Sequence, residues 1–462
     1  MLKKSYSQCN YNCEENNIEV YFEYNNSVVF DTVREARDDF NDYKCKELSV
    51  ITRCELEQNS NLLEINRYSR IDNLIIQGII TFFTGSSLTV YHSTTKVNSI
   101  TPIEYEKQDI HLKINGVDYS KDLIIILERL KQEPKLIITL LDRWRKAIYL
   151  KEESCDADLY HDEATLSFFH ILELFGESIA TELKNKLKTN IENMLYDYFN
   201  SYYFEEEKKK VMVRQNKKSI NSLLIGNHLN LSIKIKFFLE KYKLLDDNVA
   251  FFIDNIIKVR NEIAQGRRTY QEVFLWPLPP FFSMSKNSYE NVKFLSFLSA
   301  EMISKYIGIS CWEKEWNEVK YFLMPPNHII SDFLEKKLVI DNFNYNMLVL
   351  GNKYNITWRT LFNYYVKKPE KKTREYMEVA TKVAFINTLI DENNAPDVFN
   401  MSIIFTDSDD LDIKQKAIEN VKTIISNNWY GWSNFKDAYI YLDYYSVKVA
   451  WYEDFLLNQK YL

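Results

Sequence analysis

The chain has 462 residues, which is enough for about three domains of ordinary size. Hydrophobic residues make up 46% and charged residues 27%, a composition typical of soluble globular proteins that excludes disordered and collagen-like classes. The net charge of −7 argues against a protein that binds a polyanion over its whole surface. Any nucleic-acid site is therefore expected to be a local basic patch.

The residues themselves exclude several kinds of site. Only nine glycines occur, with neither a Walker A loop nor a G-x-G-x-x-G fingerprint, so a glycine-rich phosphate site is not expected. The six cysteines supply one short pair, Cys9-x3-Cys13, which is too little for a structural zinc site. Free thiols, no metal and no cofactor are expected. Without a long apolar run or a secretory signal, we expect a cytoplasmic protein with no membrane contact.

The first part of the chain is mainly strand-like. Alternation on either side of a polar turn predicts a hairpin over residues 18–30. The dipeptide Asn115-Gly116 between two short alternating runs predicts a second tight turn. A further strand pair is predicted at residues 75–84 and 88–92, around a Gly-Ser-Ser turn.

After Pro134 the apolar residues recur at helical spacing. One helix is expected around Trp144, and a second ends at Gly176, the residue type that favours the position after a helix. Further residues at helical spacing follow. A charged segment at residues 205–210 is expected to lie between helices, and a short helix is expected over residues 233–242. Asp246 supplies N-cap chemistry for the next helix.

The remaining apolar patterns are also helical. A helix through Tyr289 and Tyr306 is expected to stop at Gly308, and two helical faces follow nearer the C-terminus. The predicted fold class is α+β, mainly α. It comprises a β-rich N-terminal domain at 1–130, a helical bundle at 131–325 and a mainly helical C-terminal region at 326–462. The two C-terminal faces comprise Tyr376, Val379, Val383, Ile386 and Ile390, and Ala417, Val421 and Ile424.

The helix after Asp246 carries an arginine on its apolar stripe. Arg260 falls about 40° from Ile256 on an ideal helix, inside the stripe. Because arginine is almost never fully buried without a partner, it is expected to pair with a carboxylate, emerge at the edge or line a cleft. The stripe comprises Val249, Phe252, Ile253, Ile256 and Ile263.

The segment Arg260-Asn-Glu-Ile-Ala-Gln-Gly266 resembles the signature of HEPN domains, which are helical bundles with the motif Arg-Asn-x-x-Ala-His-Gly. Residues 167–175 resemble the first HEPN helix, with Glu173 at its acidic position. The β-rich N-terminal region and the helix around Trp144 resemble the Apea-like branch found in bacterial abortive-infection systems. The resemblance covers roughly residues 135–310, which makes the predicted bundle HEPN-like.

The resemblance implies a metal-independent RNA endonuclease of anti-phage defence, in which the ribose 2′-hydroxyl attacks the adjacent phosphate. Arg260 would hold the phosphate as its negative charge grows, and a histidine would move protons near neutral pH. The implied partners are RNA, with tRNA as one candidate, and a second copy that dimerises through the bundle. A phage-derived or host trigger would act at the N-terminal domain.

The sequence departs from the family at the proton-transferring position, because Gln265 stands where the motif has histidine. A carboxamide cannot take a proton, so cleavage is expected to be about 10²- to 10⁴-fold slower unless another base acts. Three explanations stay open. Gln265 is a substitution introduced to silence a toxic nuclease, it is natural in a form that binds without cutting, or Lys258, His170 or His228 replaces the histidine.

The other motif residues each have two interpretations. Asn261 either orients Arg260 or bonds the phosphate, or it is simply an exposed residue near a helix end. Arg267 and Arg268 either extend the RNA-binding patch or, lying after the helix end, offset its dipole. Lys258 is expected to belong to the same RNA-binding patch. Gly266 is expected to supply a left-handed cap, and Glu173 to form a salt bridge with Arg260.

Other features beyond the motif favour ordinary structural roles. The proline-rich aromatic loop at 274–282 either packs on the bundle or stacks on bases. The basic residues of 367–374 form either a solvated linker or an RNA track, and the acidic residues of 407–412 belong to the first turn of a helix rather than to a calcium loop. The rival function is a non-catalytic module that binds a protein partner.

Overall fold

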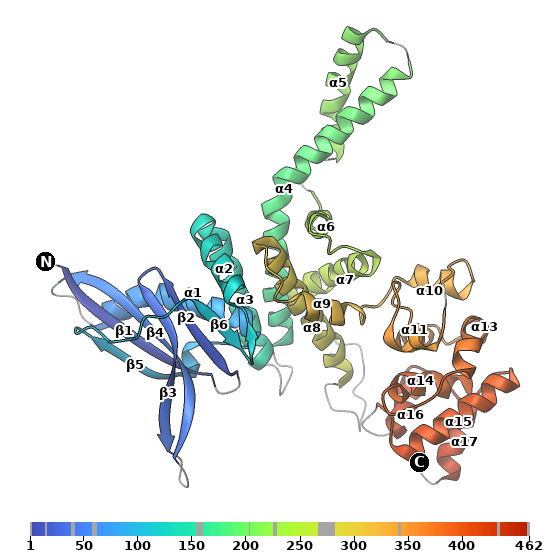
Figure 1. Ribbon diagram of the computed structural model, residues 1–462. Coiled ribbons are helices and arrows are strands. Elements are labelled where there is room, and N and C mark those ends of the chain that lie inside the picture. Colours follow the sequence, from blue (N-terminus) through green and yellow to red (C-terminus); the bar gives the residue numbers. More distant parts are fainter. Residues whose placement is uncertain are drawn as a thin grey trace. The chain divides into compact units, whose positions relative to one another are not determined.

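The computed structural model describes most of the chain and divides it into two compact units (Figure 1). The first unit comprises Met1–Leu244 and Asn291–Trp316, and the second comprises Leu245–Glu290 and Asn317–Leu462. A sheet near the N-terminus is followed by helices, so the predicted α+β, mainly α class is confirmed. The described residues are 2–13, 16–37, 42–57, 62–153, 160–202, 204–224, 229–266, 282–340, 343–431 and 435–459.

The sheet of the first unit has seven strands in the order β5-β1-β4-β3-β2-β6-β7. Every paired neighbour is antiparallel, and the longest pairings join β4 to β1 and to β3. The strands are β1 (Leu2–Asn12), β2 (Ile18–Tyr24), β3 (Ser27–Arg37), β4 (Asp42–Glu57), β5 (Ser93–Ser99), β6 (His111–Ile114) and β7 (Val117–Asp118).

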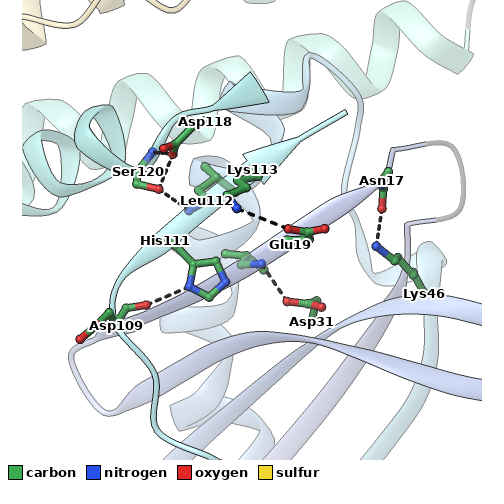
Figure 2. Close-up of polar contacts among 11 residues, drawn as sticks. Asn17, Glu19, Asp31, Lys46, Asp109, His111, Leu112, Lys113, Asp118 and Ser120 are labelled. Atoms are coloured by element: carbon green, nitrogen blue, oxygen red, sulfur yellow. Dashed lines mark hydrogen bonds and ion pairs between the residues drawn. The ribbon is translucent and has the colours of Figure 1, made fainter. Parts of the chain in front are cut away.

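Both predicted hairpin turns are confirmed. Strands β2 and β3 pair around residues 25 and 26, and β6 pairs with β7 around Asn115 and Gly116, whose φ angles are 50° and 82°. Figure 2 shows how this edge is joined to α2 (Ser120–Gln132): the Ser120 hydroxyl donates to Asp118 and accepts from the Leu112 amide at 3.1 Å. The turn therefore leads directly from the sheet into the first helix after it.

The predicted strand pair at residues 75–84 and 88–92 is wrong. Residues Leu62–Thr84 form helix α1, and Val90–His92 form a short 3-10 helix. Ile76, Ile79 and Ile80 are buried at helical spacing, and α1 packs on β1 and β4. A short, continuously apolar run fits a buried strand and a buried helix equally well, so its periodicity alone could not decide.

Helices α3 (Pro134–Glu153) and α4 (His161–Asn200) confirm the helical patterns that follow Pro134. The buried Trp144 ring packs edge-on against Phe82, Phe168 and Trp312, with centroid distances of 5.8, 5.5 and 5.7 Å. This aromatic cluster joins α1, α3 and α4 into one core.

The prediction that a helix ends at Gly176 is wrong, because α4 continues for 24 further residues to Asn200. A Cβ atom at position 176 would lie 3.3 Å from the Lys234 Cβ atom, on α6 (Leu231–Lys241). The glycine therefore serves the close approach of two helices rather than a helix end. Helix α6 itself confirms the short helix predicted there.

The charged segment at 205–210 does not lie between helices, as predicted, but begins α5 (Glu206–Leu224). Glu206 pairs with Lys209 at 2.8 Å and Glu207 with Lys210 at 3.0 Å, one turn apart, which stabilises the start of a helix. Figure 1 shows α5 running back alongside the outer half of α4. This helical pair has a small core of its own, made by Ile191, Leu195, Phe199 and Val213.

In the second unit, the helices that follow Pro326 surround one large core. Trp358 and Phe385 meet edge-on in that core at a centroid distance of 5.7 Å. Two helices run across the boundary between the units: α8 (Phe282–Ile307), which stops before Gly308 as predicted, and α9 (Glu313–Lys320). The others are α7 (Asp247–Ala264), α10 (Asn327–Leu334), α11 (Tyr345–Leu350), α12 (Trp358–Lys367), α13 (Lys371–Ile386), α14 (Ala395–Phe405), α15 (Leu411–Asn427), α16 (Phe435–Tyr444) and α17 (Ala450–Asn458).

One of the two C-terminal faces is predicted correctly. Ala417, Val421 and Ile424 are buried on α15, but Val383 on α13 is 74% exposed, and Tyr376 and Val379 are exposed with it. The buried face of α13 is the opposite one, which includes Met377, Thr381, Ala384 and Phe385. Because α13 has apolar residues on both faces, spacing alone could not identify its inner face. Among the described residues, no helix is long and apolar enough to cross a membrane.

Candidate functional site

Helix α7 begins where the sequence predicts. The Asp246 side chain accepts a hydrogen bond from the Val249 amide at 2.9 Å, and it also pairs with Lys320 at 2.5 Å. This capping satisfies one of the amides that a helix start leaves without a partner. The predicted apolar stripe is buried at Val249, Phe252, Ile253 and Ile256, while Ile263 is half-buried.

Arg260 lies on the last two turns of α7, half-buried, with its guanidinium directed toward its neighbour. Its Nη1 atom donates to the Asn261 Oδ1 atom at 3.0 Å. Gln265 is about 140° around an ideal helix from Arg260 but only about 40° from Asn261. The Arg260–Asn261 hydrogen bond therefore turns the charged group toward the side of the helix that carries Gln265.

The end of α7 is closed by backbone hydrogen bonds. The Gln265 amide donates to the Asn261 carbonyl at 3.1 Å, and the Gly266 amide donates to the Ile263 carbonyl at 3.0 Å. Gly266 has a φ angle of 62°, the left-handed conformation expected for this position. A Cβ atom there would meet nothing within 4 Å, so the constraint on this residue is conformational and not one of space.

Not all of the predicted site residues share one face. Asn261, Gln265 and Lys258 are exposed, but Lys258 lies about 200° from Arg260 on an ideal helix and therefore projects from another side. Arg267 and Arg268 lie outside the described residues, as do His228 and residues 274–281 of the aromatic loop.

The predicted partners of Arg260 from the preceding helices belong to the other unit. Glu173 and His170 are half-buried on α4 in the first unit, whereas Arg260 belongs to the second. The Glu173–Arg260 salt bridge and the use of His170 as a base both stay predictions.

The arrangement at the end of α7 suits an anion better than it suits proton transfer. A guanidinium can donate two parallel hydrogen bonds to phosphate oxygens, and the exposed carboxamides of Asn261 and Gln265 can add donors. The C-terminal end of a helix carries partial negative charge, so a bound anion here depends on the arginine. Neither carboxamide can accept a proton from a ribose hydroxyl.

The acidic residues of 407–412 were predicted to lie in the first turn of a helix, but only Asp412 does, in α15. Asp410 caps α15 by accepting from the Ile413 amide at 3.3 Å. Asp407 accepts from the Ala450 and Trp451 amides at 2.9 and 3.2 Å, so it caps α17 from 43 residues away. Within the described ranges, no group of three or more His, Cys, Asp or Glu side chains could hold a metal ion.

The basic residues of 367–374 lie at the end of α12 and the start of α13, and several of them are engaged locally. Lys371 pairs with Asp409 at 2.6 Å, Arg374 with Glu378 at 3.3 Å, and the Lys368 ammonium lies 5.5 Å from the Tyr364 ring centroid. These pairings give no support to an RNA track, but the linker prediction holds only for residues 368–370, because Lys371, Lys372 and Arg374 belong to α13.

The sequence did not indicate a cavity of about 400 Å³ in the second unit, lined by residues between Tyr321 and Asp397. Its walls come from four separate stretches of chain, so no local spacing could have linked them.

Comparisons of the chain with protein-family models, with curated proteins and with solved structures find no match.

Proposed function

We propose that this protein is a HEPN-like, RNA-directed protein of bacterial anti-phage defence that acts in the cytoplasm as a homodimer. The end of α7 contacts the RNA backbone, and a phage-derived or host trigger acts at the N-terminal sheet. The proposal starts from the resemblance of residues 260–266 to the HEPN motif. The observation that carries it is the hydrogen bond from Arg260 Nη1 to Asn261 Oδ1 at 3.0 Å.

That hydrogen bond supports a phosphate site for two reasons. It holds the guanidinium at the partly exposed end of a helix instead of inside an apolar core, and it directs the charge toward Gln265. A charged hydrogen bond to a phosphate oxygen contributes roughly 1.5–3 kcal/mol, which is enough for one arginine to matter in binding.

In this proposal the protein binds RNA but cleaves it slowly, because Gln265 cannot serve as the general base. The fold and the phosphate contact are retained while proton transfer is lost. Restoring histidine at position 265 then restores a metal-independent ribonuclease that produces 2′,3′-cyclic phosphate ends. The active unit is the dimer, whose two motif helices face each other.

Binding of fluorescently labelled tRNA, followed by anisotropy, tests the phosphate contact directly. Arg260→Gln removes the charge at similar length, and we expect its Kd to rise about tenfold or more. The matched control is Lys422→Gln, which removes an exposed charge from α15 and is expected to leave the Kd unchanged. If Arg260→Gln melts like the unaltered protein and binds tRNA equally well, the proposal is wrong.

Gln265 also favours a second candidate function, a non-catalytic module that binds a protein partner through the same helices. A protein with this function would show no dependence of tRNA binding on Arg260. The anisotropy measurement therefore separates the two candidates before any partner is known.

A further inference from the structure

The cavity of about 400 Å³ in the second unit has the size of a small-molecule site. It lies between the segment after α9, helix α11, the first turn of α12 and the start of α14. All of its lining residues belong to the same compact unit, and all are described. It is separate from the motif at the end of α7, which does not contribute to its walls.

Part of the lining of the cavity is aromatic. Tyr321 and Phe322 are 52% and 54% exposed, and the half-buried Tyr345 also lines the cavity. Large rings left open at the mouth of a cavity provide faces on which a flat ligand can stack. The Arg359 guanidinium lies 5.9 Å from the Phe322 ring centroid and lines the same space.

The lining also holds two carboxylates with different surroundings. Asp391 accepts hydrogen bonds from the Asn393 and Asn394 amides at 2.9 and 3.0 Å, so it serves the turn before α14. Asp397, in the first turn of α14, receives no hydrogen bond from any other described residue. Burial raises the pKa of the Asp397 carboxyl above its ordinary value, and the nearby charge of Arg359 offsets this in part.

Three kinds of group therefore line one cavity: stacking rings, a carboxylate that accepts from no other described residue, and a guanidinium. The rings and the carboxylate alone would suit an organic cation, but Arg359 in the same space disfavours one. A ligand that satisfies all three is flat, carries N–H donors and is negatively charged at one end. Nucleotides have this chemistry.

We infer that this cavity binds a guanine nucleotide, with the base on the Tyr321 and Phe322 rings, its N–H edge on Asp397 and its phosphate on Arg359. Guanine presents two neighbouring donors, N1–H and the exocyclic amine, which match the two acceptor oxygens of a carboxylate. The same edge of adenine pairs one donor with an acceptor, which a carboxylate disfavours. The guanidinium binds phosphate oxygens in two-pronged fashion.

The nucleotide is either a free molecule or an unpaired guanosine of an RNA, because both present the same base and phosphate. The inference does not rest on the proposed function of α7. A failure of tRNA binding at Arg260 would leave the cavity and its chemistry unchanged.

Isothermal titration of the full chain with GMP, guanosine and AMP tests the inference. We expect saturable GMP binding, AMP binding at least about tenfold weaker, and a similar loss of GMP affinity in Asp397→Asn, which keeps the volume but removes one acceptor oxygen. The matched control is Glu392→Gln, an exposed carboxylate next to the lining residues, which is expected to bind GMP normally. Melting curves of the unliganded variants verify that each is folded.

A second arm isolates the phosphate contact. In the unaltered chain GMP should bind more tightly than guanosine, and in Arg359→Gln that difference should disappear while guanosine binding is kept. A single-stranded oligoribonucleotide with one guanosine then separates the sources. If the oligoribonucleotide binds more tightly than GMP and its binding also depends on Asp397, the ligand is a guanosine of an RNA. If the oligoribonucleotide binds more weakly than GMP, the ligand is the free nucleotide. The inference is overturned if GMP and the oligonucleotide both fail to bind, if AMP binds as well as GMP, or if folded Asp397→Asn binds GMP normally.

Discussion

Glu301 on α8 shows how one buried carboxyl makes stability depend on pH. Its side chain is buried, with one oxygen 3.3 Å from the Lys305 ammonium. Burial raises the pKa of Glu301 to about 7 from 4.5, an effect that Lys305 opposes without cancelling. The folded protein therefore holds a proton that the unfolded chain has already lost between these pH values. The resulting stability is complete below pH 4.5 and is lost as the pH rises through 7.

The substitution Glu301→Gln should remove this dependence. The free energy of unfolding of the unaltered protein, minus that of Glu301→Gln, should fall by about 3 kcal/mol as the pH rises from 4 to 8. Urea unfolding at a series of pH values measures the difference. Glu313→Gln is the control, because it removes the other carboxylate that contacts Lys305, at 3.1 Å, and keeps Glu301, so stability should still fall with pH in this variant. A flat difference for Glu301→Gln would contradict the raised pKa.

The residues of the candidate site were predictable only in part. The helical period placed Arg260 on the stripe of α7, and the preference of glycine for positive φ placed Gly266 at its end. The hydrogen bond that turns Arg260 toward Asn261 depends on side-chain rotamers, which spacing does not determine. Asp397 and Arg359 are 38 positions apart and meet at one cavity only through the packing of α12 and α14.

At the scale of the element, Gly176 allows α4 and α6 to pack closely. A Cβ atom there would lie 3.3 Å from the Lys234 Cβ atom and 3.5 Å from the Ile235 Cγ1 atom. Gly176→Val should therefore lower the free energy of unfolding by roughly 1–3 kcal/mol through overpacking, even though glycine is itself a poor helix former. Thermal or urea unfolding measures this, with Asn190→Val at an exposed position of α4 as the control. Equal effects of the two valines would show that the approach of α6 does not constrain position 176.

Asp407 caps α17 across a long loop. Asp407→Ala should cost about 1 kcal/mol of stability, because the Ala450 and Trp451 amides lose their acceptor at the helix start. Asp409→Ala removes an exposed carboxylate that pairs with Lys371 at 2.6 Å and should cost less. The comparison is made by urea unfolding, and a larger loss for Asp409→Ala would refute the capping role.

Two of the wrong predictions, those for residues 75–84 and for α13, have a common cause. Helix α1 and helix α13 both carry apolar residues that fit more than one pattern: 75–84 fits a strand or a helix, and α13 has Val383 outside and Phe385 inside. Only the neighbouring elements decide such cases, and those are not visible in a local window. By contrast, the turn at Asn115-Gly116 and the cap at Asp246 depend on a few adjacent residues and were predicted correctly.

At the scale of the whole molecule, a net charge of −7 means that the RNA binding we propose must come from few contacts. The logarithm of the binding constant should therefore fall only gently with the logarithm of the salt concentration. On single-stranded RNA each neutralised phosphate contributes about 0.7 to the magnitude of this slope. Arg260→Gln should reduce the magnitude of the slope by about one phosphate contact, whereas Lys422→Gln should not change it. Anisotropy titrations at several salt concentrations measure this. An unchanged slope in Arg260→Gln would show that Arg260 contacts no phosphate.

Although α1 lies between β4 and β5, a sheet near the N-terminus with most helices after it followed from the change of period near Pro134. The division into two units did not, because the stretch Leu245–Glu290 belongs with the C-terminal helices while Asn291–Trp316 belongs with the N-terminal part. Such an exchange is set by long-range contacts, and no change of composition marks the three points where the chain passes between the units.

The central claim is that α7 carries a ribonuclease site whose missing function is proton transfer at position 265. The most direct test incubates total tRNA, with EDTA present, with the unaltered chain, with Gln265→His and with Gln265→His combined with Arg260→Ala. We predict that Gln265→His cleaves at least about 10²-fold faster than the unaltered chain and leaves 2′,3′-cyclic phosphates, and that the double variant does not cleave. A folded, tRNA-binding Gln265→His protein that cuts no faster than the unaltered chain would contradict the account.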